Sequence, residues 1–458
     1  MAAGKGTRMK SQRPKVLHLL AGRTLLQHVL DSAKTLAARR VIVVVGHRAT
    51  EVEAAVAGGT GAAGQSDIKF VRQEPQLGTG HAVQQAVPLL GDDAVVVVLS
   101  GDVPLTRPDT LRGLIEQCAG DRLALLSIEF ADPGGYGRIV REGERVRAIV
   151  EHKDASPAQR AITEVYSGIM ALPARHLKGW LARLGNENSQ GEYYLTDIVK
   201  FAVADGVEVV AHKIADAQQV AGVNSGQQLA ALERALQLRI AEHLMDQGVR
   251  LADPARLDVR GALQCGADVS IDVNCIFEGT VKLGDGVSIG ANCVIANANI
   301  APGAVIHPFT HIDGGSIAEQ VVEVGAGSLV GPFARLRPGT KLAADVHVGN
   351  FVEVKNSLLA RGAKANHLAY LGDATVGERV NYGAGSITAN YDGAFKHQTV
   401  IEADVHVGSN CVLVAPLKIG AGGTVGGGST ITKDTPPGAL SVARGKQISV
   451  ANWKRPSK

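Results

Sequence analysis

The sequence predicts three parts: a doubly wound α/β domain over residues 1–225, a helical linker over 226–250 and a parallel β-helix over 251–458. In the first part, short β-branched runs alternate with helix-spaced segments, as in α/β domains. A single apolar stripe marks the linker, and a six-residue period marks the last part. Glycine contributes 55 of 458 residues and aromatic residues only 4 %, which favours a repeat fold with many tight turns.

The composition narrows the class of protein. The chain has 47 basic and 44 acidic residues, too balanced a ratio for a nucleic acid or an anionic membrane as the main partner. Its five cysteines form no C-x-x-C pair, which argues against a disulfide framework or a structural zinc. The longest apolar runs are too short to cross a bilayer, and the first residues do not resemble a signal peptide. We therefore expect a cytoplasmic protein.

Two apolar runs identify strands of the first domain. Residues 41–45 (VIVVV) and 95–99 (VVVVL) are continuously apolar, as in strands of a parallel sheet covered on both faces. Helical patterns occupy residues 24–36 and 80–90. In such sheets ligands bind at the carboxyl ends of the strands.

The linker is predicted as one helix. Apolar residues recur every three or four positions along one face, at Leu229, Leu232, Leu236, Ile240 and Leu244. At 1.5 Å per residue this helix spans roughly 30 Å, so we interpret it as a rigid connector.

A hexad pattern defines the last part. Apolar residues follow a six-residue grid that begins Val259, Cys265, Ile271, Phe277, Leu283, Ile289, Ile295, Ala301 and His307, and resumes at Val324 and at Val407. Six residues form one flat face, and three faces close a triangular coil; an antiparallel sandwich, the alternative, predicts irregular spacings of about 8–12 residues. The grid is broken between 307 and 324, after His367, and by an insert over 390–399. Because insertions in solenoids map to binding loops, we expect chemistry near His367 and this insert.

A glycine-rich loop opens the chain. Gly4 and Gly6 allow the backbone to approach phosphate oxygens, and Arg8 and Lys15 can neutralise their charge. The loop matches neither the P-loop nor the dinucleotide fingerprint, so a plain loop is the alternative. Further along, Gln73 precedes a second glycine-rich turn, and Asp102 directly follows the strand at 95–99. Asp102 is either a Mg²⁺ ligand or a helix cap.

A second constellation surrounds the break after residue 367. His367 lies off the grid among Arg337, Lys355, Tyr370 and Asn381. A histidine can accept a proton from an amine nucleophile, and the basic side chains can hold a sugar phosphate. A lone histidine is more often structural, which is how we interpret His307 and His311.

These motifs carry a family resemblance. In order, AAGKGTRM, PKVLH, QLGTGHA, GDVPL, GYGRI, VEHKD, QGEYYLTD and GVN resemble the Rossmann-like nucleotidyltransferase half of the bifunctional bacterial N-acetylglucosamine-1-phosphate uridylyltransferase / glucosamine-1-phosphate acetyltransferase family. The resemblance covers the whole chain. It implies in-line attack by a sugar 1-phosphate on the α-phosphorus of UTP, with Mg²⁺ on Asp102 and Asn224. It places the nucleotide and sugar on Ala2, Ala3, Gly4, Arg8, Lys15, Gln73, Gly78, Thr79, Ser100, Gly101, Asp102, Gly137, Glu151, Tyr166 and Asn224.

The chain departs from the family at two places. Tyr166 stands where the family usually has a sugar-contacting Asn. The family also carries a strand before AAGKGTRM, whereas this chain begins at Met1 inside the motif. We expect the natural protein to be about ten residues longer, which is the length of a strand and its approach.

The second half is similar to the acetyltransferase half of the same family, a left-handed β-helix that assembles as a homotrimer with acetyl sites between subunits. The resemblance implies His367 as general base and Arg337, Lys355, Tyr370 and Asn381 as contacts of glucosamine 1-phosphate. Acetyl-CoA would lie on Ala384, Asn390, Tyr391, Ser409, Gly427 and Arg444.

We therefore expect a bifunctional enzyme. It acetylates glucosamine 1-phosphate from acetyl-CoA and then transfers UMP from UTP, giving UDP-N-acetylglucosamine for peptidoglycan and lipopolysaccharide precursors. Two alternatives stay open from the sequence: a single-activity sugar-1-phosphate nucleotidyltransferase with a structural or regulatory β-helix, and a scaffold protein without chemistry.

Overall fold

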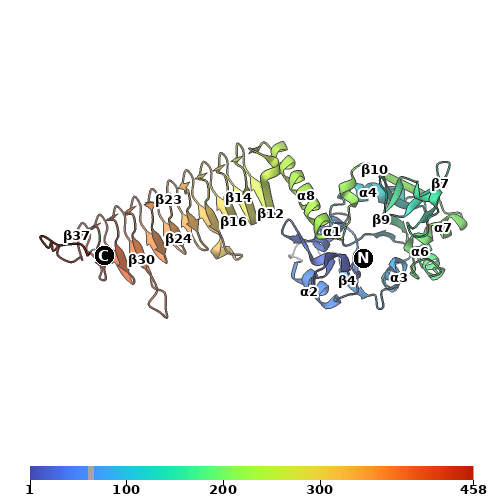
Figure 1. Ribbon diagram of the computed structural model, residues 1–458, viewed down its shortest axis with the longest axis horizontal. Coiled ribbons are helices and arrows are strands. Elements are labelled where there is room, and N and C mark those ends of the chain that lie inside the picture. Colours follow the sequence, from blue (N-terminus) through green and yellow to red (C-terminus); the bar gives the residue numbers. More distant parts are fainter. Residues whose placement is uncertain (60–66, 457–458) are drawn as a thin grey trace. The chain divides into compact units, whose positions relative to one another are not determined.

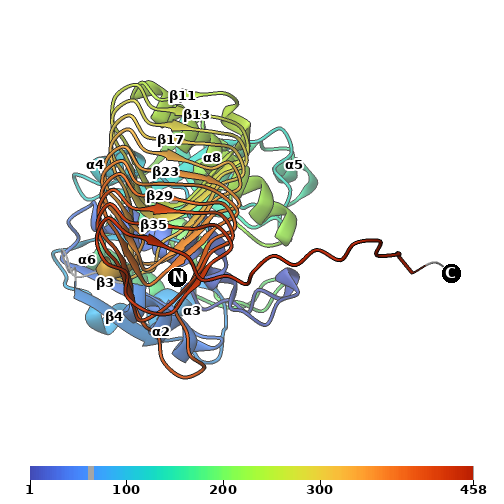
Figure 2. The ribbon, with the colours of Figure 1, turned by 90° about the vertical axis from the view of Figure 1, so that its left-hand side faces the viewer.

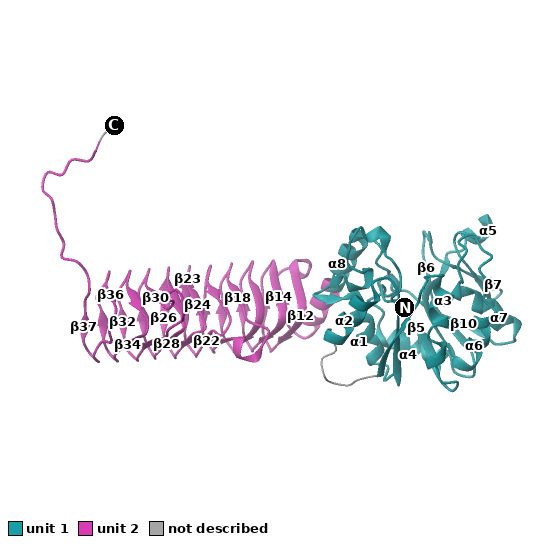
Figure 3. Cartoon of the chain, turned by 90° about the horizontal axis from the view of Figure 1, so that it is seen from below, with its two compact units in different colours: residues 1–236 teal, residues 237–458 magenta. Residues whose placement is uncertain are grey.

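The structure, a computed structural model, describes residues 1–59 and 67–456. It divides into two compact units, residues 1–236 and 237–458 (Figure 3). The boundary falls inside the expected linker helix, α8 (Gly226–Asp246). Leu232 near the beginning of α8 packs in a cluster of unit 1, whereas Ala241 and Leu244 belong to the core of unit 2. Within the described ranges, no helix has the length and apolar character that a bilayer crossing requires.

Unit 1 contains two principal sheets (Figure 1). The larger has the order β10-β6-β9-β7-β8, with β5 also paired to β9. Its strands are β5 (Val95–Val98), β6 (Leu123–Glu129), β7 (Arg138–Glu142), β8 (Arg145–Val150), β9 (Glu164–Pro173) and β10 (Val209–Ile214). The smaller pairs β3 (Arg40–Val45) with β4 (Asp67–Arg72). The two predicted apolar runs are thus β3 and β5. The smaller sheet is parallel. The larger sheet is mixed, because β6 and β10 pair in parallel, whereas β9 pairs in antiparallel with its neighbours β5 and β6.

Helices cover both faces of the larger sheet, which explains its apolar strands. Leu123 and Leu125 of β6 pack with α3, α6 and α7, whereas Ala124 and Leu126 pack with α4 on the opposite face. Alternate side chains of a strand point to opposite faces, so a strand covered on both sides must be continuously apolar. The helices of this unit before α8 are α1 (Leu25–Lys34), α2 (Ala49–Gly59), α3 (Thr79–Gln84), α4 (Pro108–Gln117), α5 (Pro157–Arg160), α6 (Ala174–Ala182) and α7 (Ile198–Ala204). Unit 1 also has a short β1–β2 pair (Leu19–Leu20, Arg23–Thr24).

The first residues lie between the two sheets. Ala2 N donates to Val44 O of β3 at 2.7 Å, while the Met1 ammonium donates to Leu99 O, just after β5, at 2.7 Å. An apolar cavity of about 340 Å³ lies beside them, lined by residues of α1, β3 and β5 that include Leu30, Val43 and Val96.

Unit 2 is a parallel β-helix, as expected (Figure 1). An 11-stranded sheet forms one side of the coils. A second sheet of 16 strands wraps the other two sides, which join at the long strands β12, β14 and β16. In the view of Figure 2 the successive coils lie one behind another, and the C-terminal segment leaves them after β37. The 11-stranded sheet contains β11 (Arg250–Leu251), β13 (Ser270–Ile271), β15 (Ser288–Ile289), β17 (Val305–Ile306), β20 (Leu329–Val330), β23 (His347–Asn350), β26 (Lys364–His367), β29 (Asn381–Tyr382), β32 (His406–Val407), β35 (Thr424–Val425) and β37 (Leu440–Ser441).

The 16-stranded sheet supplies the remaining sides of each coil. It contains β12 (Leu257–Cys265), β14 (Cys275–Leu283), β16 (Val294–Ile300), β18 (His311–Asp313), β19 (Val322–Val324), β21 (Arg335–Leu336), β22 (Lys341–Leu342), β24 (Glu353–Lys355), β25 (Leu358–Leu359), β27 (Tyr370–Gly372), β28 (Ala374–Val376), β30 (Ile387–Ala389), β31 (Thr399–Ile401), β33 (Val412–Val414), β34 (Leu417–Ile419) and β36 (Thr430–Ile431). Paired residues are commonly 17 or 18 apart, as in Leu329↔His347 and His347↔Lys364. Three hexads therefore make one coil.

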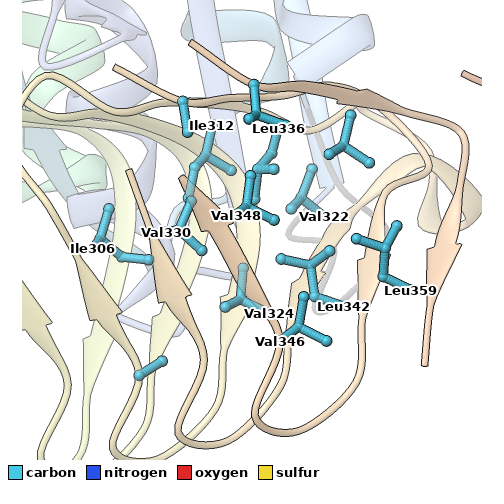
Figure 4. Close-up of a cluster of buried hydrophobic side chains, with 14 of the residues drawn as sticks. Ile306, Ile312, Val322, Val324, Val330, Leu336, Leu342, Val346, Val348 and Leu359 are labelled. Carbon is cyan, nitrogen blue, oxygen red and sulfur yellow. The ribbon is translucent and has the colours of Figure 1, made fainter. Parts of the chain in front are cut away.

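The hexad residues point into the coils and form their core. Ile306, Val330 and Leu336 are buried side chains of this kind (Figure 4). The predicted grid is wrong at Ala301 and His307, because Ile300 and Ile306 are the buried residues there. The register between β14 and β16 shifts after Glu278, so this coil is one residue shorter than three hexads.

Candidate functional sites

The opening loop of unit 1 is folded onto Lys15. Gly6 has φ +59°, and a Cβ there would lie 2.7 Å from Lys15 Cβ. Only glycine accepts this left-handed backbone and close approach at little cost. The loop therefore brings Arg8 and Lys15 to the same side of the sheet, next to Asp102.

A polar cluster forms where β5 ends. Lys15 Nζ donates to Asp102 Oδ2 at 2.5 Å and to Asn224 Oδ1 at 3.1 Å, and Arg8 Nη2 donates to the same Asn224 oxygen at 2.9 Å. Val223 N donates to Asp102 O, which fixes the two segments together. The predicted residues Arg8, Lys15, Asp102 and Asn224 are thus brought together at the carboxyl end of β5, where α/β sites lie.

The second glycine-rich turn forms the next wall. Gln73 follows β4, is 3 % exposed, and donates from Nε2 to Gly78 O at 2.8 Å. A Cβ on Gly78, whose φ is +113°, would meet Tyr193 O at 2.6 Å. Thr79 Oγ1 accepts from Leu195 N at 3.0 Å. These contacts hold Gln73, Gly78 and Thr79 in one rigid turn.

Gly137 directly precedes β7, Glu151 directly follows β8 and Tyr166 lies on β9. Tyr166 N donates to Gly137 O at 2.9 Å, and Glu151 Oε2 lies 3.7 Å from the place of a Gly137 Cβ. Thr196 Oγ1 donates to Glu151 Oε1 at 2.9 Å, and burial raises the pKa of Glu151. The Tyr166 hydroxyl is buried and, among the described residues, has no hydrogen-bond partner. Burial, and after it the charge of Glu151, raises the pKa of Tyr166.

The three groups of unit 1 surround one end of its sheets. Met1 O accepts from Gly101 N, while Ala2 is hydrogen-bonded to β3 and Gln73 N to Val45 O. Ser100 Oγ lies 3.4 Å from the place of a Gly168 Cβ. Leu195 and Thr196 connect Thr79 to Glu151. The basic groups Arg8 and Lys15 and the carboxylates Asp102 and Glu151 therefore surround one end of the sheets, with the basic pair suited to a phosphate ligand.

In unit 2, one corner of the coils carries a column of predicted residues. We call it the His367 corner: the turn between each strand of the 11-stranded sheet and the next strand of the 16-stranded sheet. Backbone hydrogen bonds stack its positions coil on coil: Leu368 N to Asn350 O, Gly385 N to His367 O, Asn410 N to Ala384 O, and Gly428 N to Ser409 O. His367, Ala384, Ser409 and Gly427 thus form one column, although they are 17, 25 and 18 residues apart. At about 4.8 Å per coil, Gly427 lies roughly 14 Å from His367.

Two contacts complete this column. Arg444, on the segment after β37, donates from Nη1 to Gly427 O at 2.7 Å. His367 is exposed, and its Nδ1 lies 3.1 Å from Asn350 Oδ1. The column therefore presents one imidazole at its start and backbone and small side chains along its length.

The predicted cations lie on the adjoining side of the coils. Arg337 Nη1 donates to Glu353 Oε1 at 2.8 Å. Lys355, at the end of β24, lies beside Lys396 of the insert; this contact first, then burial and Arg337, lowers the pKa of Lys355. Three cations and two carboxylates, Glu353 beside Arg337 and Asp373 beside Lys355, leave an excess of positive charge, which favours an anion. The Tyr370 hydroxyl lies 2.3 Å from the place of a Gly372 Cβ, so its ring lies along β27 on this side.

The insert lies at the next corner, which we call the loop corner. It comprises the turns that follow the strands β18, β21, β24, β27 and β30, including residues 390–398. Asn390 is 8 % exposed and donates to Asp373 Oδ2 at 2.5 Å. Tyr391 is exposed and donates from its hydroxyl to Gly393 O.

The residues predicted for an acetyl site lie at two different corners of the coils. His367, Ala384, Ser409 and Gly427 lie at the His367 corner, and Asn381 lies just before it on β29, paired with His406 Nδ1 at 3.1 Å. Lys355, Asn390 and Tyr391 lie at the loop corner. The two corners are separated by a three-residue strand such as β24, roughly 10 Å.

Several residues of these sites escaped sequence reasoning. Thr196, Glu353, Asp373 and Lys396 act through contacts with predicted residues. Thr196 lies in the QGEYYLTD motif and Lys396 in the insert, so their positions were marked but not their roles. Asn350 lies in the segment 349–355 that ends at the predicted Lys355, but its role was missed because its link to His367 depends on coil register.

The fold and the two sites define a two-site transferase: a nucleotide-binding α/β unit joined to a hexad β-helix with a histidine and an anion site. Residues 1–176 match the MobA-like NTP transferase domain. The chain belongs to the family of bifunctional GlmU proteins. The bifunctional protein GlmU of Albidiferax ferrireducens is 78 % identical over 459 residues, covering all of this chain and 99 % of the relative. Those of Polaromonas sp. and Nitrosomonas eutropha are 73 % and 54 % identical, over all of this chain and 97 % and 98 % of theirs. The single-activity alternative is therefore not favoured.

Proposed function

We propose that this enzyme acetylates glucosamine 1-phosphate with acetyl-CoA in unit 2 and transfers UMP from UTP to the acetylated product in unit 1. The products are UDP-N-acetylglucosamine and pyrophosphate. The observation that carries this proposal is the coexistence, in one chain of this family, of the Lys15–Asp102–Asn224 cluster and the His367 column. Each satisfies the chemistry of one reaction.

The uridylyl site suits a magnesium ion. Asp102 Oδ2 and Asn224 Oδ1 converge on the same Lys15 Nζ, at 2.5 and 3.1 Å. Mg²⁺ is usually held by one or two protein oxygens together with waters and substrate phosphates, so this pair fits. A bound ion would neutralise charge on the reacting phosphates.

The protein groups then position the in-line reaction. A phosphate oxygen of N-acetylglucosamine 1-phosphate attacks the α-phosphorus of UTP, and the bond to pyrophosphate breaks. Lys15, with Arg8 beside it, binds phosphate oxygens, while the backbone of Ala2–Gly4, Gln73, Gly78 and Thr79 hold the uridine nucleotide. Gly137, Glu151 and Tyr166 hold the sugar, next to Ser100 and Gly101. Positioning and charge neutralisation supply most of the catalysis in such reactions.

The acetyl site uses His367 as general base. Its Nε2 accepts a proton as the amine of glucosamine 1-phosphate attacks the thioester carbonyl, and the thiolate of coenzyme A leaves. Arg337, Lys355, Tyr370 and Asn381 bind the sugar phosphate. The column of Ala384, Ser409 and Gly427, with Arg444, and the insert residues Asn390 and Tyr391 hold acetyl-CoA.

A homotrimer would complete this site, and an exposed apolar ridge supports it. Phe309, Phe333, Phe351 and Leu368 occupy one position of the His367 corner in successive coils and are 47–60 % exposed. Their rings stack at 4.9 and 5.4 Å. All four have φ between +47° and +61°, where other coils place Asn or Gly, such as Asn292 and Gly385. Large residues in this strained backbone indicate a function other than folding. A second copy covering the ridge would lie next to His367, because Leu368 belongs to the ridge.

The buried or half-buried cysteines are unpaired. We place the enzyme in the cytoplasm, where thiols stay reduced.

Single-site variants test the two-reaction proposal. We expect His367→Ala to abolish release of free coenzyme A thiol while keeping pyrophosphate release from UTP and N-acetylglucosamine 1-phosphate. Asp102→Asn should do the reverse, lowering uridylyl transfer at least about 100-fold. Asp109→Asn, at an exposed residue of the same unit, is the control. Loss of both activities in either variant would contradict two independent sites.

A further inference from the structure

We propose that Asn350 is a positioning residue that holds His367 in the tautomer and orientation needed for acetyl transfer. The inference rests on the proposed role of His367 as general base. It begins from the contact between Asn350 Oδ1 and His367 Nδ1, at 3.1 Å. An amide oxygen only accepts hydrogen bonds. His367 Nδ1 must therefore carry the hydrogen, and the lone pair is left on Nε2.

The backbone fixes this contact. Asn350 at the end of β23 pairs in register with His367 at the end of β26, and Asn350 O accepts from Leu368 N at 3.0 Å. The preceding residue, Gly349, allows the two coils to approach: a Cβ there would lie 2.0 Å from Asn366 O. Both side chains therefore leave the same corner from adjacent coils.

An amide is the suitable partner for a base that must be neutral. A carboxylate at this place would favour the protonated imidazole, which cannot accept a proton. Other titratable groups lie on the packed strands: His347 on β23, Lys364 on β26, Glu353 on β24 and Tyr370 on β27. In the part of the chain that the structure describes, the contact recorded for the His367 ring is with Asn350. Asn350 thus sets the ring without adding charge.

Two variants of the full chain test the proposal. In Asn350→Ala the imidazole loses its partner, and we expect kcat for acetyl transfer to fall about 3- to 10-fold, the loss of one hydrogen bond. KM for both substrates and uridylyl transfer should stay within about twofold. In Asn350→Asp the acidic limb of the kcat/KM profile should move about 1 pH unit upward, because the carboxylate stabilises the imidazolium.

Asn299→Asp, at the exposed residue of β16 in the same unit, makes the same chemical change away from His367 and controls for added charge. Imidazole ¹⁵N chemical shifts, assigned by difference from His367→Ala, report the tautomer directly. We expect the Nδ1–H form in the wild type and a mixture in Asn350→Ala. Unchanged kcat, pH profile and tautomer in the Asn350 variants, with His367→Ala inactive, would overturn the role of Asn350 alone. An active His367→Ala would instead overturn the proposed base.

Discussion

Replacing Phe351 by Asn separates folding from assembly. Phe351 is 56 % exposed and lies in the apolar ridge beside His367. A phenylalanine side chain presents about 200 Å², so about 110 Å² remains for a partner to cover. At about 25 cal/mol per Å² this contributes somewhat under 3 kcal/mol. Because asparagine retains part of the surface, we expect each interface to weaken by about 2 kcal/mol, roughly 30-fold in dissociation constant.

The same substitution should leave the β-helix intact. Phe351 has φ +58°, and asparagine tolerates this left-handed backbone better by about 1 kcal/mol. Lost stacking on Phe333, 5.4 Å away, removes a similar amount. The free energy of unfolding of unit 2 should thus change by less than about 1 kcal/mol. Asparagine already occupies the equivalent position at Asn292 and Asn410, both with positive φ.

Sedimentation over a dilution series and acetyl transfer measured in parallel provide the assay. We expect the variant to dissociate at concentrations where the wild type stays assembled, and acetyl transfer to fall with dissociation and recover on concentration. Uridylyl transfer should stay unchanged. Ile317→Asn replaces an exposed residue off the ridge and should behave as wild type. Unaltered sedimentation of the Phe351 variant down to the lowest concentration would refute the ridge as an interface.

Two further predictions concern Glu151 and Gly349. Burial raises the pKa of Glu151, so it protonates at a higher pH than an exposed carboxyl group. The KM for N-acetylglucosamine 1-phosphate should rise as the pH falls through the mildly acidic range, whereas Glu151→Gln should show a high KM with no such slope; equal slopes would contradict a sugar contact. Gly349→Ala places a Cβ 2.0 Å from Asn366 O, so unit 2 should lose about 2–4 kcal/mol of stability in denaturant titrations. Gly445→Ala, with nothing within 4 Å of its Cβ position, should lose less than about 1 kcal/mol.

The hexad period could be predicted because every coil obeys one steric rule: the inward residue of each flat face must fill the same narrow core. Where a coil departs from three hexads, the rule cannot say which residue is omitted. The short coil containing β16 illustrates this, because Ile300 replaces the expected Ala301 inside. The strands β3 and β5 were evident for a related reason, since burial on both faces requires an unbroken apolar run. Their place in a mixed sheet was not, because pairing partners are set by contacts far along the chain.

The site residues also divide into those that the local sequence predicts and those that depend on contacts far along the chain. Asp102 was predictable because it directly follows a strand, where ligands of α/β sheets lie. Lys15 is 87 residues from Asp102 and 209 residues from Asn224 along the chain. Only the resemblance to a family indicated that these three residues lie together. Asn350 and Thr196 were missed because their contribution is one hydrogen bond to another site residue, which leaves no pattern in the sequence.

Some coils of the β-helix are lengthened by insertions, yet the column at the His367 corner stays continuous. Both insertions fall at the loop corner: residues between β18 and β19, and residues 390–398 between β30 and β31. At the His367 corner the segment between successive strands stays short, as from His367 to Tyr370 and from Tyr382 to Ile387. The coil can therefore lengthen by seven residues between Asn381 and His406 without displacing Ser409 from beneath Ala384. A ligand lying along several coils needs a corner of constant length, which the His367 corner provides, whereas the loop corner accommodates the insertions. An insertion between Asn366 and Ala369 would therefore interrupt the column at His367, the proposed general base.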